Sequence, residues 1–112
     1  MYTLKLKHYF DSAHHLINYK GKCANIHGHR WNVEVKIQTY ILKDDMVLDF
    51  TIIKTIINEL DHQDLNVLFL DINPTAENIA KYLYDKIQEK IPEALVEIIL
   101  WESPEASITY SI

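Results

Sequence analysis

The stretch "HRWNVEVKIQTYIL" (29–42) alternates between polar and apolar side chains through most of its length. Successive side chains of a strand point to opposite faces, so a period of two predicts a strand with one buried face. The apolar face carries Trp31, Val33, Val35 and Ile37, and the polar face carries Asn32, Glu34, Lys36 and Gln38. A sheet built around this strand is the expectation from which the rest of the chain is interpreted.

Three other segments also have the patterns of strands. Residues 2–10 alternate in the same way, with Tyr2, Leu4, Leu6, His8 and Phe10 on one face. Segments 94–102 and 107–112 are short and rich in apolar residues, which is typical of strands. Residues 11–28 are mixed in character and contain both glycines of the chain, so they predict a loop, and 43–45 predicts a turn.

Two segments show helical periodicity. The first begins after Asp49, and either Asp49 or Thr51 can cap it. The second is amphipathic over 73–91; Pro74 suits a first helical position after an Asn73 cap, with Thr75 as the alternative cap. Their apolar stripes are Ile52, Ile53, Ile56, Ile57 and Leu60 in the first, and Ala76, Ile79, Ala80, Leu83 and Ile87 in the second.

The order of these elements is β-β-α-α-β-β, with 61–74 as the connector between the helices. Two hairpins separated by helices predict an α+β fold, in which both helices cover one face of a four-stranded antiparallel sheet. The whole chain, 1–112, is expected to form one domain. Four strands leave two open edges, and long open edges usually pair with other strands, so we expect a homo-oligomer closed through strand pairing.

Composition and charge narrow the function classes. The 112 residues are 48% apolar and carry a formal net charge of -5, with Arg30 as the single arginine, so no basic footprint for a nucleic acid is expected. No apolar run has the length of a membrane span, about 20 residues. The N-terminal stretch lacks a signal-peptide pattern, and one free thiol, Cys23, suits a reducing compartment, so we expect a cytoplasmic protein without a membrane partner.

The triplet "HGH" (27–29) is the first candidate site. If a strand begins at His27, then His27 and His29 project from the same face and can reach one metal ion. A third histidine would complete an open site of the catalytic type, and the candidates are His8, His14, His15 and His62. Two alternatives remain open. The pair can be ordinary polar residues with hydrogen-bond partners, or Cys23 can join the histidines in a closed structural zinc site.

Two carboxylates are the other candidates. Asp61 adjoins His62, and a carboxylate beside an imidazole orients the ring and suits it to move protons near pH 7. The same pair can simply end a helix. Glu102 follows the apolar strand in register with its buried face, where a carboxylate needs donors such as the paired N–H groups of a cyclic amidine. Alternatively, Glu102 reaches water at the end of the strand.

Taken together, these stretches resemble the family of 6-pyruvoyltetrahydropterin and 6-carboxytetrahydropterin synthases. The resemblance rests on "FDSAHHL" (10–16), "CANIHGH" (23–29), "LDF" (48–50), "LDHQDLN" (60–66), "NPTAENIAKYL" (73–83) and "WES" (101–103). They occur in the order of the family and span nearly the whole chain. The resemblance implies the tunnelling fold (T-fold), a four-stranded antiparallel sheet with two helices, assembled as a trimer or as a hexamer made of two trimers.

The resemblance also implies roles for individual residues. One Zn²⁺ per subunit is expected on His14, His27 and His29, while His15 receives no role. Cys23 is expected to be the thiolate that removes a proton, together with Asp61 and His62 contributed across a subunit boundary. Glu102 is expected to anchor the pterin, with Thr75 and Glu77 nearby.

The spacing of Cys23 implies a branch of the family. Three residues separate it from the His-Gly-His triplet, as in the bacterial 6-carboxy enzymes of queuosine biosynthesis, whereas the 6-pyruvoyl branch typically has five. The implied reaction converts 7,8-dihydroneopterin triphosphate to 6-carboxy-5,6,7,8-tetrahydropterin, releasing acetaldehyde and triphosphate. Lys20 and Lys22 are the candidates for binding the triphosphate, because His15 stands where bacterial members often have arginine.

Two other functions stay open at this point. The first is a 6-pyruvoyltetrahydropterin synthase, which stops after the triphosphate has been eliminated. The second is a zinc-stabilised oligomerisation module without catalytic activity.

Overall fold

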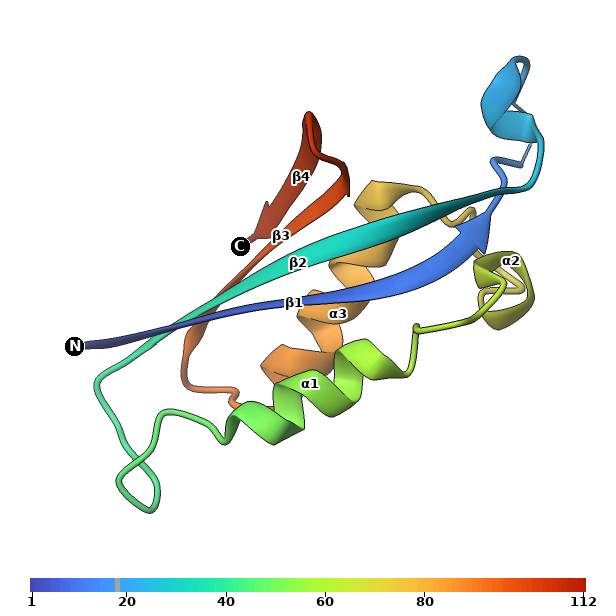
Figure 1. Ribbon diagram of the computed structural model, residues 1–112. Coiled ribbons are helices and arrows are strands. Elements are labelled where there is room, and N and C mark those ends of the chain that lie inside the picture. The colour runs from blue at the N-terminus through green and yellow to red at the C-terminus, as the bar shows by residue number, and fades with distance from the viewer. Residues whose placement is uncertain (18) are drawn as a thin grey trace.

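The fold is built on one antiparallel sheet with the strand order β1-β2-β3-β4 (Figure 1). A computed structural model describes residues 1–17 and 19–112, and for Cys23 it describes the backbone alone. The strands are β1 (Tyr2–His14), β2 (His27–Thr39), β3 (Leu95–Ser103) and β4 (Ala106–Ser111). The expected α+β class and its four-stranded antiparallel sheet are therefore confirmed.

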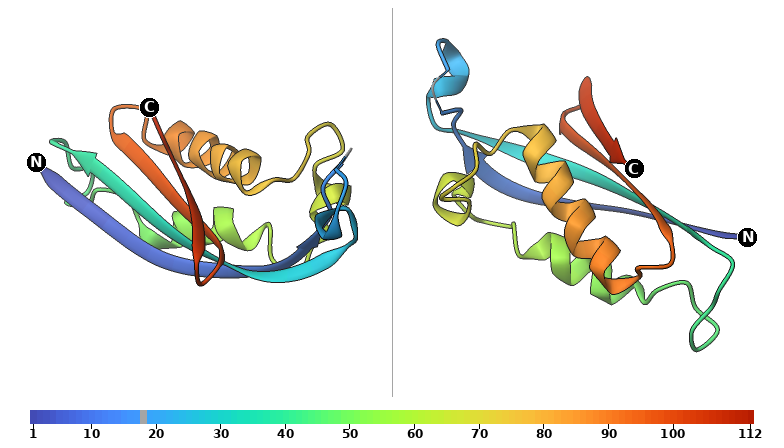
Figure 2. Two further views of the ribbon diagram at one scale, coloured as in Figure 1. Left: turned by 90° about the horizontal axis from the view of Figure 1, so that it is seen from above. Right: turned by 180° about the vertical axis from the view of Figure 1, so that it is seen from behind.

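Two long helices lie on the same side of this curved sheet, as the view from above shows (Figure 2). The helical elements are the 3₁₀ helix η1 (Lys22–Ala24) and the α-helices α1 (Phe50–Asn58), α2 (Leu65–Leu68) and α3 (Ala76–Lys90). The carboxylate of Asp49 accepts a hydrogen bond from the amide of Thr51 and so caps α1, as predicted. The cap of α3 is Thr75, whose hydroxyl accepts from the amide of Asn78. The preferred Asn73 cap was wrong.

The core lies between the sheet and these helices. The four apolar residues on the inner face of β2 are at most 2% exposed, and the predicted stripe of α3 is buried throughout. Burying apolar area contributes roughly 25 cal/mol per Å², so this face supplies most of the driving force for folding. On α1 the prediction holds for Ile53, Ile56 and Ile57, but Ile52 is 36% exposed because it lies on the flank of the helix.

Several predicted boundaries were wrong. The first strand does not end at Phe10 but continues to His14, because Ser12 and His14 keep the alternation with polar side chains that are nevertheless buried. The second strand ends at Thr39, before the predicted limit of 42. The connector 61–74 contains the short helix α2, which Asp64 caps through the amide of Asn66.

The segment that follows α1 covers the outer edge of β1 near the C-terminal end of the strand. The amide of His62 donates to the carbonyl of Asp11 at 2.7 Å, and the amide of Ala13 donates to the carbonyl of Gln63 at 3.1 Å. The rest of β1 and the whole of β4 form the two edges of the sheet. Within the described residues, no helix combines the length and the apolar character needed to cross a membrane.

Candidate metal centre

Three histidines converge where β1 and β2 pair at one end of the sheet. His14 lies directly opposite His27, and Ser12 lies opposite His29, so the alternation of both strands sends all three imidazoles to the helix-covered face. The ring centroids are 4.5 Å apart for His14 and His27, 5.2 Å for His14 and His29, and 4.6 Å for His27 and His29. The predicted convergence of these three rings is thus present in the structure.

Hydrogen bonds to backbone carbonyls orient two of the rings. Nδ1 of His14 lies 2.7 Å from the carbonyl oxygen of Pro74, and Nδ1 of His27 lies 2.7 Å from that of Asn25. A carbonyl oxygen can only accept, so each Nδ1 carries the proton and each Nε2 keeps its lone pair. Metal-binding histidines are commonly oriented through the second ring nitrogen in this manner.

Glu102 is the fourth member of the cluster. Its Oε1 atom lies 3.3 Å from Nε2 of His14 and 3.1 Å from Nε2 of His29, and all four donor atoms lie within 4.8 Å of one another. These contacts lack hydrogen-bond alignment, so the buried Nε2 atoms of His14 and His29 have no partner within the described structure. Ligands at about 2.0–2.1 Å from a tetrahedral zinc ion are about 3.3 Å apart. The donor set therefore fits a zinc ion.

The electrostatics around His29 favour its neutral imidazole, which is the form that binds a metal. Burial lowers the pKa of His29, and the neighbouring rings of His27 and His14 lower it further, although Glu102 acts in the opposite direction. His14 is only 1% exposed, so its ring is shielded from water. The cluster is thus a partly buried site with several lone pairs directed at one point.

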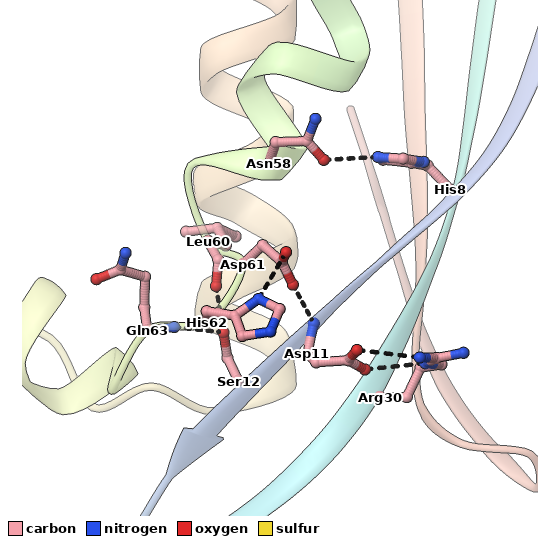
Figure 3. A network of polar contacts seen from close by, with 9 residues as sticks. All are labelled: His8, Asp11, Ser12, Arg30, Asn58, Leu60, Asp61, His62 and Gln63. Atoms are coloured by element: carbon pink, nitrogen blue, oxygen red, sulfur yellow. Dashed lines mark hydrogen bonds and ion pairs between the residues drawn. The ribbon is translucent and has the colours of Figure 1, made fainter.

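The other candidate histidines lie away from this cluster. The backbone amide of His15 donates to Oδ1 of Asn66 at 2.8 Å, and its ring faces the same side chain on α2. Nε2 of His8 lies 2.7 Å from Oδ1 of Asn58 at the end of α1 (Figure 3). Both side chains hold a helix against β1, which is a structural role.

Asp61 and His62 form a hydrogen-bonded pair beside β1 (Figure 3). Oδ2 of Asp61 accepts from Nδ1 of His62 at 2.8 Å, and Oδ1 accepts from the amide of Asp11 at 2.8 Å. These bonds lower the pKa of Asp61, the amide of Asp11 contributing most. With the proton on Nδ1, Nε2 of His62 carries a lone pair, and the side chain is 82% exposed. Among the described residues, no contact joins this pair to the histidine cluster.

The remaining predicted residues lie around the cluster or outside the described parts. The backbone of Cys23 belongs to η1, but its side chain lies outside the described residues, so the structure tests neither of its predicted roles. Glu77 and Glu102 line a cavity of about 180 Å³ between the start of α3 and β4. Thr75 caps α3 directly before this cavity. Lys20 and Lys22 are exposed.

Arg30, the single guanidinium, is engaged within its own chain. Its Nε and Nη2 atoms donate to the two carboxylate oxygens of Asp11 at 2.9 and 3.1 Å, and its guanidinium lies 4.2 Å from the ring centre of Tyr9. The ion pair lowers the pKa of Asp11 and raises that of Arg30. This arginine is therefore occupied by a carboxylate in the structure.

Some members of the site were not found from the sequence. The carbonyls of Pro74 and Asn25 leave no signal, since every residue has a carbonyl. Glu102 was predicted as a site residue, because it continues the alternation of the buried residues Val96, Ile98 and Leu100. Its contact with the histidines was not predicted, because the sequence offered no reason to pair it with residues of other strands.

A sheet covered by helices on one face, with a partly buried histidine–carboxylate cluster at one end, defines an α+β protein with a candidate metal centre, and comparison with known proteins identifies the family. The model of the family "6-pyruvoyl tetrahydropterin synthase" matches residues 3–112. The chain belongs to this family, which confirms the resemblance found in the sequence.

Some relatives are named 6-carboxytetrahydropterin synthases and others are named 6-pyruvoyl synthases. A putative 6-carboxy-5,6,7,8-tetrahydropterin synthase of Pyrococcus horikoshii is 31% identical over 94% of this chain and 89% of its own length. The 6-pyruvoyl tetrahydrobiopterin synthase of Drosophila melanogaster is 38% identical over 80% of this chain and 61% of its own. Among solved structures, the 6-pyruvoyl tetrahydropterin synthase of Caenorhabditis elegans has a TM-score of 0.81 and 25% identity, with 99% of this chain and 95% of that one covered.

Proposed function

We propose that the protein is a zinc-dependent lyase that converts 7,8-dihydroneopterin triphosphate to 6-carboxy-5,6,7,8-tetrahydropterin, with release of acetaldehyde and triphosphate. The observation that carries the proposal is the convergence of His14, His27, His29 and Glu102, in which Nε2 of His14 and Nε2 of His29 have no hydrogen-bond partner among the described residues. The names of relatives such as the Pyrococcus protein support the 6-carboxy product. This reaction would serve queuosine biosynthesis, and the single thiol suits the cytoplasm.

His14, His27 and His29 would hold the zinc ion, with the carboxylate of Glu102 within reach as a fourth donor in the absence of substrate. When bound, zinc supplies Lewis-acid chemistry that polarises an oxygen of the substrate side chain. The carbonyls of Pro74 and Asn25 keep the rings of His14 and His27 aimed at this point.

Proton transfer would fall to Cys23 and to the Asp61–His62 pair. Cys23 as a thiolate takes a proton from the side chain of the substrate. His62 delivers and accepts protons through its free Nε2 while Asp61 holds Nδ1. In this way the side chain is oxidised while the ring is reduced, and no redox cofactor is consumed.

Recognition of the pterin ring would use the cavity between α3 and β4. Glu102 and Glu77 border this cavity, and a carboxylate can accept both parallel N–H groups of a cyclic amidine. Glu102 is one-third exposed, so its side chain can turn from the histidines towards the ring. Thr75 precedes Ala76, which lines the cavity, and would contribute beside it; its hydroxyl accepts from the amide of Asn78.

Assembly would complete the site. The exposed Asp61–His62 pair is not in contact with the cluster of its own chain, which favours a site shared between subunits. The open edges of β1 and β4 offer main-chain groups for pairing with further copies, giving a trimer or a hexamer. A closed ring of such contacts leaves no edge unpaired.

The deciding experiment incubates the purified, zinc-loaded protein with 7,8-dihydroneopterin triphosphate. We expect a product with the mass of 6-carboxytetrahydropterin and one equivalent of trapped acetaldehyde. Release of triphosphate without acetaldehyde would favour the 6-pyruvoyl product, which the name of the Drosophila relative supports. No product, together with unfolding when the zinc is chelated, would favour the zinc-stabilised oligomerisation module.

A further inference from the structure

Ser12 connects the two halves of the proposed site. It lies on β1 opposite His29, two residues before His14, and is 6% exposed. Its hydroxyl donates to the carbonyl of Leu60 and accepts from the amide of Gln63 at 3.3 Å. One buried hydroxyl therefore bridges the residues that precede and follow the Asp61–His62 pair (Figure 3).

The main chain of β1 adds bonds to the same turn. The amide of Asp11 donates to the Asp61 carboxylate, the carbonyl of Asp11 accepts from the amide of His62, and the amide of Ala13 donates to the carbonyl of Gln63. These main-chain bonds are available to any residue type. The hydroxyl of Ser12 is the one side-chain contribution from the strand among these contacts.

The turn needs such support because its backbone is unfavourable. His62 has a φ of 55°, in the left-handed region that is sterically unfavourable for a residue with a Cβ atom. A strained backbone conformation persists when several independent contacts with the surrounding structure hold it in place. The buried hydroxyl of Ser12 adds two such restraints, because it forms a hydrogen bond on each side of the turn. Its removal would leave the carbonyl of Leu60 without that partner.

We infer that Ser12 is a positioning residue for proton transfer: its hydroxyl fixes the Asp61–His62 pair to the strand that carries His14. The inference rests on the proposed function, since it gives a role to a residue that contacts neither metal nor substrate. Its consequence is geometric. With the hydroxyl present, the His62 ring has one orientation and its proton lies on Nδ1. Without the hydroxyl, the turn relaxes and the ring adopts other orientations as well.

The test compares Ser12→Ala, Ser12→Thr and a matched control, Ser111→Ala, which removes an exposed hydroxyl from β4. The first readout is NMR of the ¹⁵N-labelled, zinc-loaded protein. We expect Ser12→Ala to lose the dominant Nδ1–H form of His62 and to exchange the Gln63 amide about tenfold faster, the effect of one lost hydrogen bond. Ser12→Thr keeps a hydroxyl and should retain the wild-type values, as should the control.

The second readout is kinetic. We expect Ser12→Ala to keep its zinc and its KM while kcat falls about tenfold, with recovery in Ser12→Thr. An unchanged His62 ring and Gln63 exchange in Ser12→Ala would refute the bridge. A relaxed turn with an unchanged kcat would refute the positioning role. A wild-type protein without turnover would instead refute the proposed function, while the NMR data still decide whether the hydroxyl fixes the turn.

Discussion

The adjacent residues His14 and His15 provide a matched pair for testing the metal centre. His14 is buried with an unpaired Nε2 atom facing Glu102, whereas the His15 ring faces Asn66 on α2. We therefore expect His14→Ala to lose stoichiometric zinc and His15→Ala to keep it. The two changes remove the same side chain at neighbouring positions, so only the location of the ring differs.

The size of the effect follows from linkage. Loss of a partner that merely orients a metal ligand lowers affinity 10- to 100-fold, so loss of a ligand should cost at least about 100-fold, or about 2.7 kcal/mol of zinc-derived stability. A chain of 112 residues has an unfolding entropy of about 0.24 kcal/mol per degree. Zinc should therefore raise the Tm of His14→Ala by about 11 °C less than it raises that of the wild type.

The assay is thermal unfolding with and without a chelator, combined with metal analysis of each variant. The difference between the two Tm values isolates zinc, because His14→Ala also leaves a cavity and frees the Pro74 carbonyl in both conditions. His15→Ala should show the wild-type difference. Full zinc content in His14→Ala, or its loss in His15→Ala, would show that the third ring of the site has been chosen wrongly.

Four further outcomes are expected. Cys23→Ala should keep its zinc and lose turnover; loss of the metal would make the thiol a ligand. Cys23→Ala and His62→Ala, each inactive alone, should recover about a quarter of the activity after subunit mixing if neighbours share a site, and none if each subunit is self-contained. The side chain of Gln88 accepts a hydrogen bond from a tyrosine hydroxyl and donates to two backbone carbonyls, at 2.8–3.0 Å. Gln88→Ala removes these bonds and should lower the free energy of unfolding, measured in urea, by about 2 kcal/mol. The control Glu89→Ala should lower it by less than about 0.5 kcal/mol. The pKa of Asp61 is lowered in the folded protein, so the ionised carboxylate stabilises the fold at pH values above the ordinary pKa of 3.8. This stability is lost as the pH falls through the lower pKa of the folded state. Asp61→Asn should therefore make the stability of the protein depend less on pH in acid.

The fold could be predicted where burial followed a simple period. The alternation of β2 and the stripe of α3 fixed their inner faces, and Asp49 marked the start of α1. The prediction ended β1 too early because its last buried residues are polar: Ser12 and His14 are inside for reasons of bonding and not of hydrophobicity. Helix α2 has only four residues, which is too short for a periodic pattern to be recognised.

The site could be predicted in part. The triplet at 27–29 gives two rings on one face, but the selection of His14 over His15 came from the family resemblance, and the structure adds its physical basis in the register of β1 with β2. The place of Glu102 depends on the pairing of β2 with β3, which spans more than half of the chain. Such long-range pairing is not encoded in any local pattern, so the contact of Glu102 with the histidines had to come from the structure.

The direct opposition of His14 and His27 has a consequence for how the chain folds. A slip of one residue between β1 and β2 would turn His27 and His29 to the polar face and separate them from His14. An ion held by all three rings is compatible with one alignment only. Zinc would thus act during refolding as a lock on strand alignment, and refolding in its absence should populate misaligned hairpins that the metal-loaded chain avoids.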